Sequence, residues 1–332
     1  MLRDTLKTLL EAYGGVGSEH GVADVIRGLL EGHVDTMKTD VMGNLIVEKF
    51  GTDDNGKRIM IAAHMDHIGL IVTHIEDNGF LRVTNVGGIG VDMVRGRHVV
   101  FENGMNGVCW VEPKETGTPT LNNLFIDIGA ATAEEAAAQV SLGDVAVYAP
   151  NVFNLGKHRV ASPAMDDRCA CALLVELLQY AEEQKNTIVG VFTTQEELGL
   201  RGATVAAYAV NPDIGLALDV TAWGDTPETK LPAVKLGEGP AVKIMDRSMV
   251  ATPAVRDALF SAAELAGVKV QREVLAFGGT DGGAIQRTRA GVPTGTLSIP
   301  CRYVHSACET IDMRDMEGAL KLLLQFVDHV DI

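Results

Sequence analysis

The sequence predicts an α/β fold with a mixed, largely parallel central sheet flanked by helices, and with a small β-rich domain inserted into it. Residues 187–194 form an apolar, β-branched run, which is typical of a buried parallel strand. Strand and helix patterns alternate in the N-terminal and C-terminal segments, whereas the middle segment contains short β-like runs separated by Gly, Pro and Asn. We therefore expect one domain built from residues 1–67 plus 161–332, and an inserted domain at residues 68–160.

The N-terminal segment predicts two helices followed by two strands. Apolar residues recur at helical spacing within residues 6–13 and again within residues 22–29, and a pair of glycines separates the two patterns. Ser18 is a candidate N-cap for the second helix, because its hydroxyl can accept a backbone hydrogen bond. Apolar, β-type runs then predict strands at residues 44–50 and 58–63.

The inserted segment predicts mainly strands. Thr132 and Glu135 have the spacing of a capping box, which predicts one short helix at residues 136–140. A Gly-Ile-Gly stretch at residues 88–90 lacks the third glycine and the strand–helix context of a dinucleotide-binding fingerprint, so we interpret it as turns. The expected strands are at residues 80–86, 98–101, 107–111 and 144–148.

The C-terminal segment returns to alternating strands and helices. A glycine-dense turn at residues 277–283 leads into one of the helices. Another helix is expected to begin near residue 167, and further helices are expected at residues 204–210, 254–265 and 312–330. The expected strands cover residues 187–194, 214–220, 268–274 and 294–299.

Composition and charge exclude several classes of partner. The chain has 332 residues, of which 46% are hydrophobic, a formal net charge of −16 and a pI near 4.9. Such a negative surface repels phosphate backbones, so we expect no nucleic-acid partner. The five cysteines are scattered and form no Cys-x-x-Cys pair, which is typical of buried thiols in a reducing compartment. With neither an apolar run of membrane-spanning length nor a signal-peptide pattern, we expect a soluble, cytoplasmic protein without a membrane partner.

Two adjacent carboxylates, Glu196 and Glu197, follow directly after the predicted strand at residues 187–194. In open α/β sheets, ligands and chemistry gather at the carboxyl ends of the strands. Adjacent residues that leave a strand point in different directions, so one glutamate can bind a metal while the other faces the substrate. Considered alone, the pair is more typical of a solvated loop.

Residue types that bind metals recur at five similar positions, each just after an apolar strand or at the start of a helix. Two histidines and three carboxylates suit a pair of Zn²⁺ or Co²⁺ ions about 3.5–4 Å apart, with Asp166 as the bridging carboxylate. Each residue also has an ordinary interpretation: a lone His is commonly a hydrogen-bonded core or surface group, and an Asp before a helix is commonly its N-cap. The five candidates are His64, Asp166, Glu197, Asp219 and His305.

Short motifs surround these candidates and together resemble one known family. The motifs are Ala-His64-Met-Asp66, Met-Asp166-Asp167-Arg168, Gln-Glu196-Glu197-Leu-Gly-Leu-Arg-Gly-Ala, Leu-Asp219-Val, Gly278-Gly279-Thr280-Asp281 and Arg302-Tyr-Val-His305-Ser. They resemble, in matching order and spacing, the tetrahedral-assembly dinuclear metalloaminopeptidases, which include glutamyl and deblocking aminopeptidases. The resemblance covers nearly the whole chain.

The resemblance implies a cofactor of two divalent metal ions per subunit, Zn or Co. It implies that His64, Asp166 and Asp219 bind one ion. It implies that Asp166, Glu197 and His305 bind the other.

The resemblance also implies roles for two further carboxylates. Glu196 would be the general base, which accepts a proton from a metal-bridging water and passes it to the leaving amine. Asp66 would be a carboxylate that orients His64 or the base. His67 departs from the family pattern, which usually has Glu at this position. We expect histidine in place of glutamate beside the ligands to affect metal affinity or pH dependence. The replacement removes none of the five ligands.

The substrates and partners that the resemblance implies are short peptides with a free N-terminus and further copies of this chain. Dimers would form through the inserted domain and join into a hollow assembly of twelve subunits. Acidic, basic and apolar side-chain preferences all occur among proteins with these motifs.

Other functions are compatible with parts of the pattern. A carboxypeptidase or an amide deacylase would use the same dinuclear core, although no arginine cluster for a free carboxylate is evident. A glycosidase would pair Glu196 or Glu197 with a distant acid, but it would leave His64 and His305 unexplained. A non-catalytic protein with a relict site would not need Glu196 as a spare base. The resemblance favours the aminopeptidase.

Overall fold

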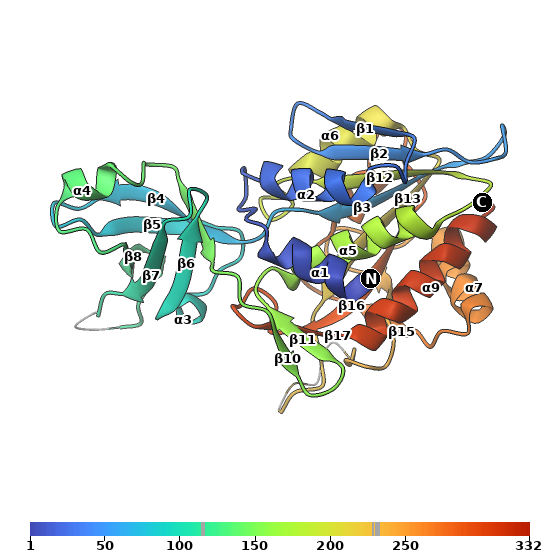
Figure 1. The fold of residues 1–332 in the computed structure, drawn as a ribbon. Helices are drawn as coiled ribbons and strands as arrows, with labels where there is room; N and C mark the ends of the chain where they lie inside the picture. Colours follow the sequence, from blue (N-terminus) through green and yellow to red (C-terminus); the bar gives the residue numbers. More distant parts are fainter. Residues whose placement is uncertain (114–116, 228, 230–232) are drawn as a thin grey trace.

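The chain folds into two parts, a larger layered α/β domain and a smaller β-barrel that extends from it (Figure 1). The computed structural model describes residues 1–113, 117–227, 229 and 233–332. Both ends of the chain lie in the larger part (Figure 1). The predicted fold class is confirmed: a mixed, partly parallel sheet is flanked by helices and accompanied by a small antiparallel β domain.

An eleven-stranded sheet forms the centre of the larger part. Its strands are β1 (Thr36–Thr39), β2 (Leu45–Lys49), β3 (Arg58–His64), β10 (Phe153–Leu155), β11 (Arg159–Ser162), β12 (Thr187–Thr193), β13 (Ile214–Thr221), β14 (Ala241–Met245), β15 (Gln271–Val274), β16 (Thr294–Arg302) and β17 (Glu309–Asp312). The main path runs β1-β2-β12-β3-β13-β16-β17-β11-β10, and β14 joins β15 to β16 beside it. The central strands β12, β3, β13 and β16 are mutually parallel.

The central strands are almost fully buried, because they carry apolar and β-branched residues toward both faces of the sheet. Their register aligns their carboxyl ends: Thr193 at the end of β12 pairs with His64 at the end of β3. Asp219 of β13 pairs in the same way with Ser298 of β16. Side chains at the ends of different strands therefore meet at one edge of the sheet.

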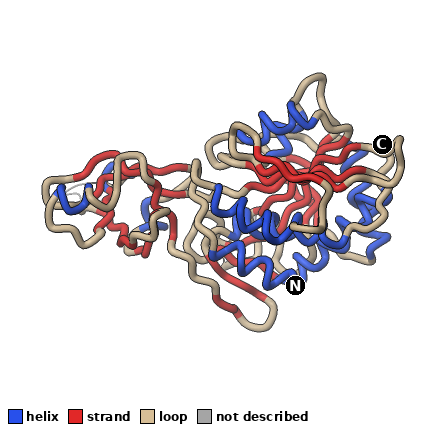
Figure 2. Tube along the Cα trace, turned by 45° about the horizontal axis from the view of Figure 1, so that its top comes forward, coloured by secondary structure: helices blue, strands red, loops and turns tan. Residues whose placement is uncertain are grey.

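Two layers of helices cover the sheet (Figure 2). The helices are α1 (Leu2–Glu11), α2 (His20–Leu30), α5 (Met165–Tyr180), α6 (Arg201–Val210), α7 (Pro253–Ala266), α8 (Asp281–Gln286) and α9 (Met313–His329). One core cluster joins α1, α2, α5, α7 and α9 to the sheet, and a smaller cluster joins α6 and α8 to it. Among the described residues, no helix is long and apolar enough to cross a membrane.

The smaller part is a closed antiparallel barrel with the strand order β4-β5-β8-β7-β6-β9. Its elements are β4 (Gly69–Ile75), β5 (Leu81–Val86), α3 (Val91–Val94), β6 (Arg97–Phe101), β7 (Asn106–Val111), the 3₁₀ turn η1 (Leu121–Asn123), β8 (Leu124–Asp127), α4 (Ala133–Ala137) and β9 (Val145–Tyr148). Exposed and buried residues alternate along β7, as expected for a strand with one face toward a core. The barrel has its own core cluster, which includes Leu70, Val83, Phe101 and Ile126.

Three local predictions were wrong. Ser18 does not cap α2: its backbone N–H closes a turn onto the Gly15 carbonyl, and Glu19 is the N-cap residue without a side-chain cap bond. The helix expected at residues 136–140 is α4, which ends at Ala137, although the Thr132 hydroxyl accepts a hydrogen bond from the Glu135 N–H as expected. Several short strands were also missed, including β4, β8, β11, β14 and β17.

Candidate metal centre

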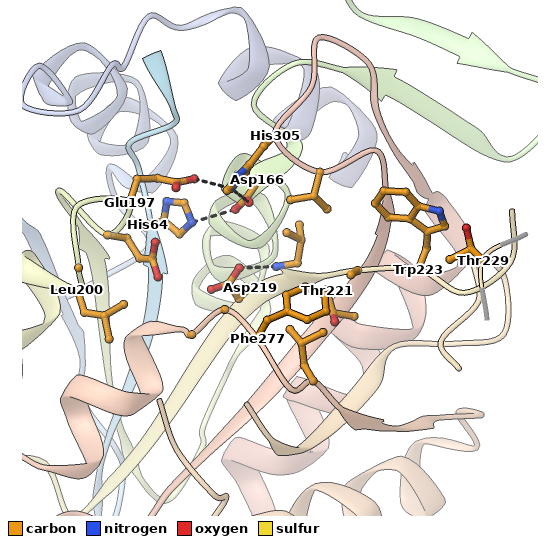
Figure 3. A pocket seen from close by; sticks show the side chains of 18 residues that line it. His64, Asp166, Glu197, Leu200, Asp219, Thr221, Trp223, Thr229, Phe277 and His305 are labelled. Carbon is orange, nitrogen blue, oxygen red and sulfur yellow. Dashed lines mark hydrogen bonds and ion pairs between the residues drawn. The ribbon is translucent and has the colours of Figure 1, made fainter. Parts of the chain in front are cut away.

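All five predicted ligands line one cavity of about 650 Å³ at the carboxyl ends of the central strands (Figure 3). His64 is the last residue of β3, Asp219 lies near the end of β13, and Glu197 follows β12. Asp166 lies in the first turn of α5, and His305 lies in the loop between β16 and β17. The fold thus gathers ligand-type side chains from five separate segments of the chain.

Asp166 lies between the two histidines. Its Oδ1 is 3.0 Å from Nε2 of His64, and its Oδ2 is 3.4 Å from Nε2 of His305. His305 Nε2 is also 3.2 Å from Oε1 of Glu197 (Figure 3). A carboxylate with one oxygen toward each of two imidazoles has the arrangement that a bridge between two ions requires.

Both histidines are oriented through their other ring nitrogen. Nδ1 of His64 lies 2.8 Å from the backbone carbonyl oxygen of Asp66, and Nδ1 of His305 lies 2.8 Å from that of Gly88. A carbonyl oxygen can only accept, so each Nδ1 carries a hydrogen and donates it. In the neutral ring, the Nε2 lone pair then faces Asp166, which is how metal-binding histidines are commonly held.

The pKa values follow from this crowding of charges. Burial acts to lower the pKa of His305, but the hydrogen bonds to Asp166 and Glu197 outweigh it and raise the value to about 12. The pKa of His64 is also raised, since the Asp166 hydrogen bond and neighbouring carboxylates outweigh burial. Burial raises the pKa of Asp219 well above its usual range, and the Asp166 charge adds to the effect. The cluster therefore has a strong affinity for positive charge.

The donor atoms suit divalent cations. The described residues contain two groups whose ligand atoms lie within 4.8 Å of one another: His64 with Asp166 and Glu197, and His64 with Asp167 and Asp219. Asp167 has a buried oxygen, Oδ1, without a hydrogen-bond partner among the described residues. Imidazole nitrogen and carboxylate oxygen are the donors that Zn²⁺ and related ions prefer. Asp167 was not among the five ligands predicted from the sequence. The peptide bond between Asp166 and Asp167 is cis.

Asp66 fixes the segment that carries the glutamate pair. It is fully buried, and its two carboxylate oxygens accept hydrogen bonds from the backbone N–H groups of Glu196 (2.9 Å) and Glu197 (3.1 Å). Burial raises its pKa to about 7. Its Oδ1 is 3.7 Å from Nδ1 of His64. The carboxylate of Asp66 thus lies closer to the backbone of the glutamate pair than to the imidazole of His64.

Glu309 is a buried carboxylate that sequence reasoning missed. Its Oε2 accepts a hydrogen bond from the backbone N–H of Asp166 (3.0 Å), and its Oε1 accepts one from the backbone N–H of His305 (2.6 Å). One side chain thereby fixes the backbone of two candidate ligands from distant segments. Burial raises its pKa to about 8, and the Asp166 charge adds to the effect. No motif or periodicity marks this position in the sequence.

The barrel also contributes to the centre, through the turn after β5. A Cβ on Gly88 would lie 2.8 Å from Nδ1 of His305, and a Cβ on Gly87 would lie 3.1 Å from Oε2 of Glu197. Only glycine allows this backbone to approach the two ligands so closely. Residues 88–90 form turns as predicted, but the contact of Gly88 with His305 was not anticipated.

His67 lies close to the ligands but not among them. It is buried, and its backbone N–H donates to the Gly14 carbonyl. Burial and the Arg168 charge lower its pKa to about 3, so the ring is neutral. It is in neither of the two candidate ligand groups and does not line the cavity.

Comparison with known proteins agrees with this geometry. The family model described as M42 glutamyl aminopeptidase matches residues 43–322. The chain belongs to this family.

Similarity to other M42-type proteins extends over the whole chain. A putative aminopeptidase of Acetivibrio thermocellus is 43% identical, over 98% of each chain. The structure of an aminopeptidase from the archaeon Desulfurococcus kamchatkensis is 38% identical, with a TM-score of 0.94 over 98% of this chain and 94% of that chain. The Pyrococcus horikoshii TET1 peptidase, described as able to assemble into a tetrahedron or a large octahedral shell, is 34% identical, with a TM-score of 0.89 over 99% and 100% of the two chains.

Membership of the M42 family confirms the family resemblance seen in the sequence and the predicted class of enzyme. The protein is an aminopeptidase, a hydrolase that acts on peptide bonds. The cluster of histidines and carboxylates in this M42 chain agrees with binding of divalent metal.

Replacing Glu309 by glutamine should weaken metal binding. The amide keeps one acceptor oxygen, but its NH₂ group faces a backbone N–H that has lost its partner, so Asp166 and His305 are less well held. Loss of a residue that orients ligands typically costs about 10–100-fold in metal affinity. Chelator competition, with metal content measured per subunit, gives the affinity of each ion.

Glu176→Gln is the matched control, because Glu176 is equally buried in α5 but accepts its hydrogen bond from the Thr5 hydroxyl (2.5 Å). This variant should lose stability without losing metal affinity. Unfolding of both variants in excess chelator separates stability from metal binding. Wild-type affinity for both ions in Glu309→Gln would show that Glu309 does not position the ligands.

Proposed function

We propose that this protein is a dinuclear metalloaminopeptidase that removes residues one at a time from the free N-terminus of short peptides. The observation that supports it most directly is Asp166, whose two oxygens face two different histidines. In this proposal one ion, Zn²⁺ or Co²⁺, is bound by His64, Asp166 and Asp219. The second is bound by Asp166, Glu197 and His305.

Glu196 is the general base of the proposed reaction. Bound ions would supply Lewis acidity toward the scissile carbonyl and toward the attacking water. Glu196 lines the cavity beside the ligands, and the Asp66 carboxylate fixes its backbone by accepting a hydrogen bond from its N–H. Burial raises the pKa of Glu196, and the negative charge of Asp219 adds to the effect. A raised pKa suits a group that takes a proton from water and returns it to the leaving amine.

The charge of the cavity favours the N-terminus over the C-terminus. Of the four carboxylates that line the cavity, Asp166, Glu197 and Asp219 are proposed ligands and Glu196 is not, so Glu196 can attract an ammonium group and would repel a substrate carboxylate. A carboxypeptidase would instead need a free cation for the substrate carboxylate. The guanidinium of Arg302 is not free, because it donates hydrogen bonds of 2.8 and 2.6 Å to Asp225.

This function is tested by determining which end of a peptide the enzyme cleaves. The metal-loaded enzyme should produce N-terminal ladders from a free decapeptide and from its C-amidated form, because both keep the ammonium group. An N-acetylated form should remain intact, since its acetamide has no charge for the acidic site. Mass spectrometry follows all three peptides over time. A C-terminal ladder, or cleavage of the acetylated peptide, would contradict the proposal and favour a carboxypeptidase or deacylase.

The variant Glu196→Gln should keep both metals but lose most of its activity. A general base contributes about 10²–10⁴-fold to the rate, whereas the five proposed ligands are unchanged. Metal content and turnover are measured on the same sample. If a metal is lost together with the activity, Glu196 is a ligand and the roles of Glu196 and Glu197 are reversed.

Assembly is the proposed role of the inserted domain. We assign residues 1–67 plus 161–332 to catalysis and residues 68–160 to dimer formation, with six dimers forming a dodecamer. Within the second segment, the strands of the barrel end at Tyr148, and β10 pairs within the larger sheet. The barrel has its own core and exposes Val108 and Trp110 on the outer face of β7, as a surface that binds another copy would. The Pyrococcus horikoshii relative assembles into a closed shell, which supports the same proposal. The five free cysteines support a reducing, cytoplasmic location.

Light scattering tests the assembly. At micromolar concentration the particle should have about twelve times the subunit mass of 35.3 kDa. The mass should not change on moderate dilution, because a closed shell leaves no subunit with a free interface. A monodisperse particle of the subunit mass would contradict the proposal.

A further inference from the structure

The wall of the cavity next to the metal centre is apolar. Beyond the ligands, the described lining residues include Leu200, Val220, Trp223, Leu275, Phe277 and Val304 (Figure 3). Phe277 follows β15, is 56% exposed and lies on the opening of the cavity. When an apolar group covers a large aromatic side chain that is exposed to water, the free energy of the complex is lowered.

The polar groups of this wall already have partners inside the protein. The Thr221 hydroxyl donates a hydrogen bond of 2.7 Å to the buried Glu273 carboxylate. The indole N–H of Trp223 donates one of 2.7 Å to the Thr226 hydroxyl, which shares another of 2.6 Å with the Thr229 hydroxyl. Trp223 also packs edge-on against Tyr303, at 5.5 Å between ring centres. Among the described residues, the side-chain donors of Thr221 and Trp223 are thus not available to a polar substrate side chain.

The charged groups behind the wall are also paired. The Lys243 ammonium lies 2.5 Å from Glu273, and both side chains are buried. Arg302 likewise forms a two-bond ion pair with Asp225. Among the described residues that line the cavity, the charged side chains are all members of the metal centre.

We propose that this cavity selects peptides whose first residue has a large apolar side chain, such as leucine, methionine or phenylalanine. The inference rests on the proposed aminopeptidase function and specifies its substrate class. A charged side chain placed against this wall would lose its hydration without gaining a partner of opposite charge there, because the charged groups behind the wall are paired with each other. An acidic side chain would in addition face the carboxylates around the ions. The glutamyl specificity in the family's description does not extend to this chain.

A panel of aminoacyl coumarin amides tests the preference directly, because each differs only in the first residue. The Zn²⁺- or Co²⁺-loaded enzyme is assayed with the leucyl, methionyl, phenylalanyl, glutamyl, lysyl and arginyl amides. We expect kcat/KM for the leucyl amide to exceed that for the glutamyl and lysyl amides at least about tenfold.

Phe277→Glu and Val274→Glu form a matched pair of variants. Both residues are exposed, at 56% and 58%, and they are three positions apart, but only Phe277 lines the cavity. In Phe277→Glu the new carboxylate gives a lysyl side chain a partner, so the leucyl-to-lysyl ratio of kcat/KM should fall at least about fivefold. Val274→Glu adds the same charge outside the cavity and should leave the ratio unchanged.

The outcomes separate this inference from the proposed function. A wild-type preference for the glutamyl, lysyl or arginyl amide would overturn the apolar selection and leave the aminopeptidase intact. An equal change of the ratio in both variants would also overturn it, because the cavity wall would then not determine the preference. Hydrolysis of none of the amides by the folded, metal-loaded enzyme would overturn the proposed function, and the inference with it.

Discussion

The structure depends on a concentration of carboxylates that the fold holds together at one edge of its central sheet. Asp66, Asp166, Asp167, Asp219 and Glu309 are all buried there. Their mutual repulsion has to be offset, and the protein offsets part of it with backbone N–H groups. Asp66 accepts from the segment of the glutamate pair, and Glu309 accepts from the segments of Asp166 and His305. Carboxylates outside the proposed ligand set thus hold the backbone that carries the ligands, and divalent cations offset the remaining negative charge.

The same centre connects parts of the chain that are distant in sequence. Arg168, directly after the two aspartates of α5, is fully buried and donates hydrogen bonds to the carbonyls of Met65, Leu9 and Ala12. It thereby ties the end of α1 to the loop that follows His64. On the barrel side, the Gly88 carbonyl accepts from His305. A change in the position of the barrel would consequently move the Gly88 carbonyl and disturb the hydrogen bond that orients His305, a proposed metal ligand.

The sequence predicted the parts of the fold and of the site that depend on local pattern. Continuous β-branched runs identified the central strands, and parallel register then aligned their ends, so side chains such as His64 and Asp219 could be expected to meet. Closure of the barrel and the short outer strands depend on pairings between distant segments and leave little local signal. Glu309 and Gly88 could not be identified because their partners lie far away in the sequence. Glu309 accepts from the backbone N–H of Asp166, and the Gly88 carbonyl accepts from the ring of His305.

Electrostatics divides the cavity into two regions with different tasks. On one side, the carboxylates attract the metal ions, and Glu196, which is not a proposed ligand, would attract the ammonium group of a peptide. On the other side, Lys243 with Glu273 and Arg302 with Asp225 cancel each other's charge, so that wall exerts little field of its own. A buried ion pair is seldom a source of net stability, since its desolvation offsets its attraction. In the proposed reaction, this pairing confines the charge of the described cavity lining to the metal centre, so the field would orient the peptide and the apolar wall would contact its first side chain.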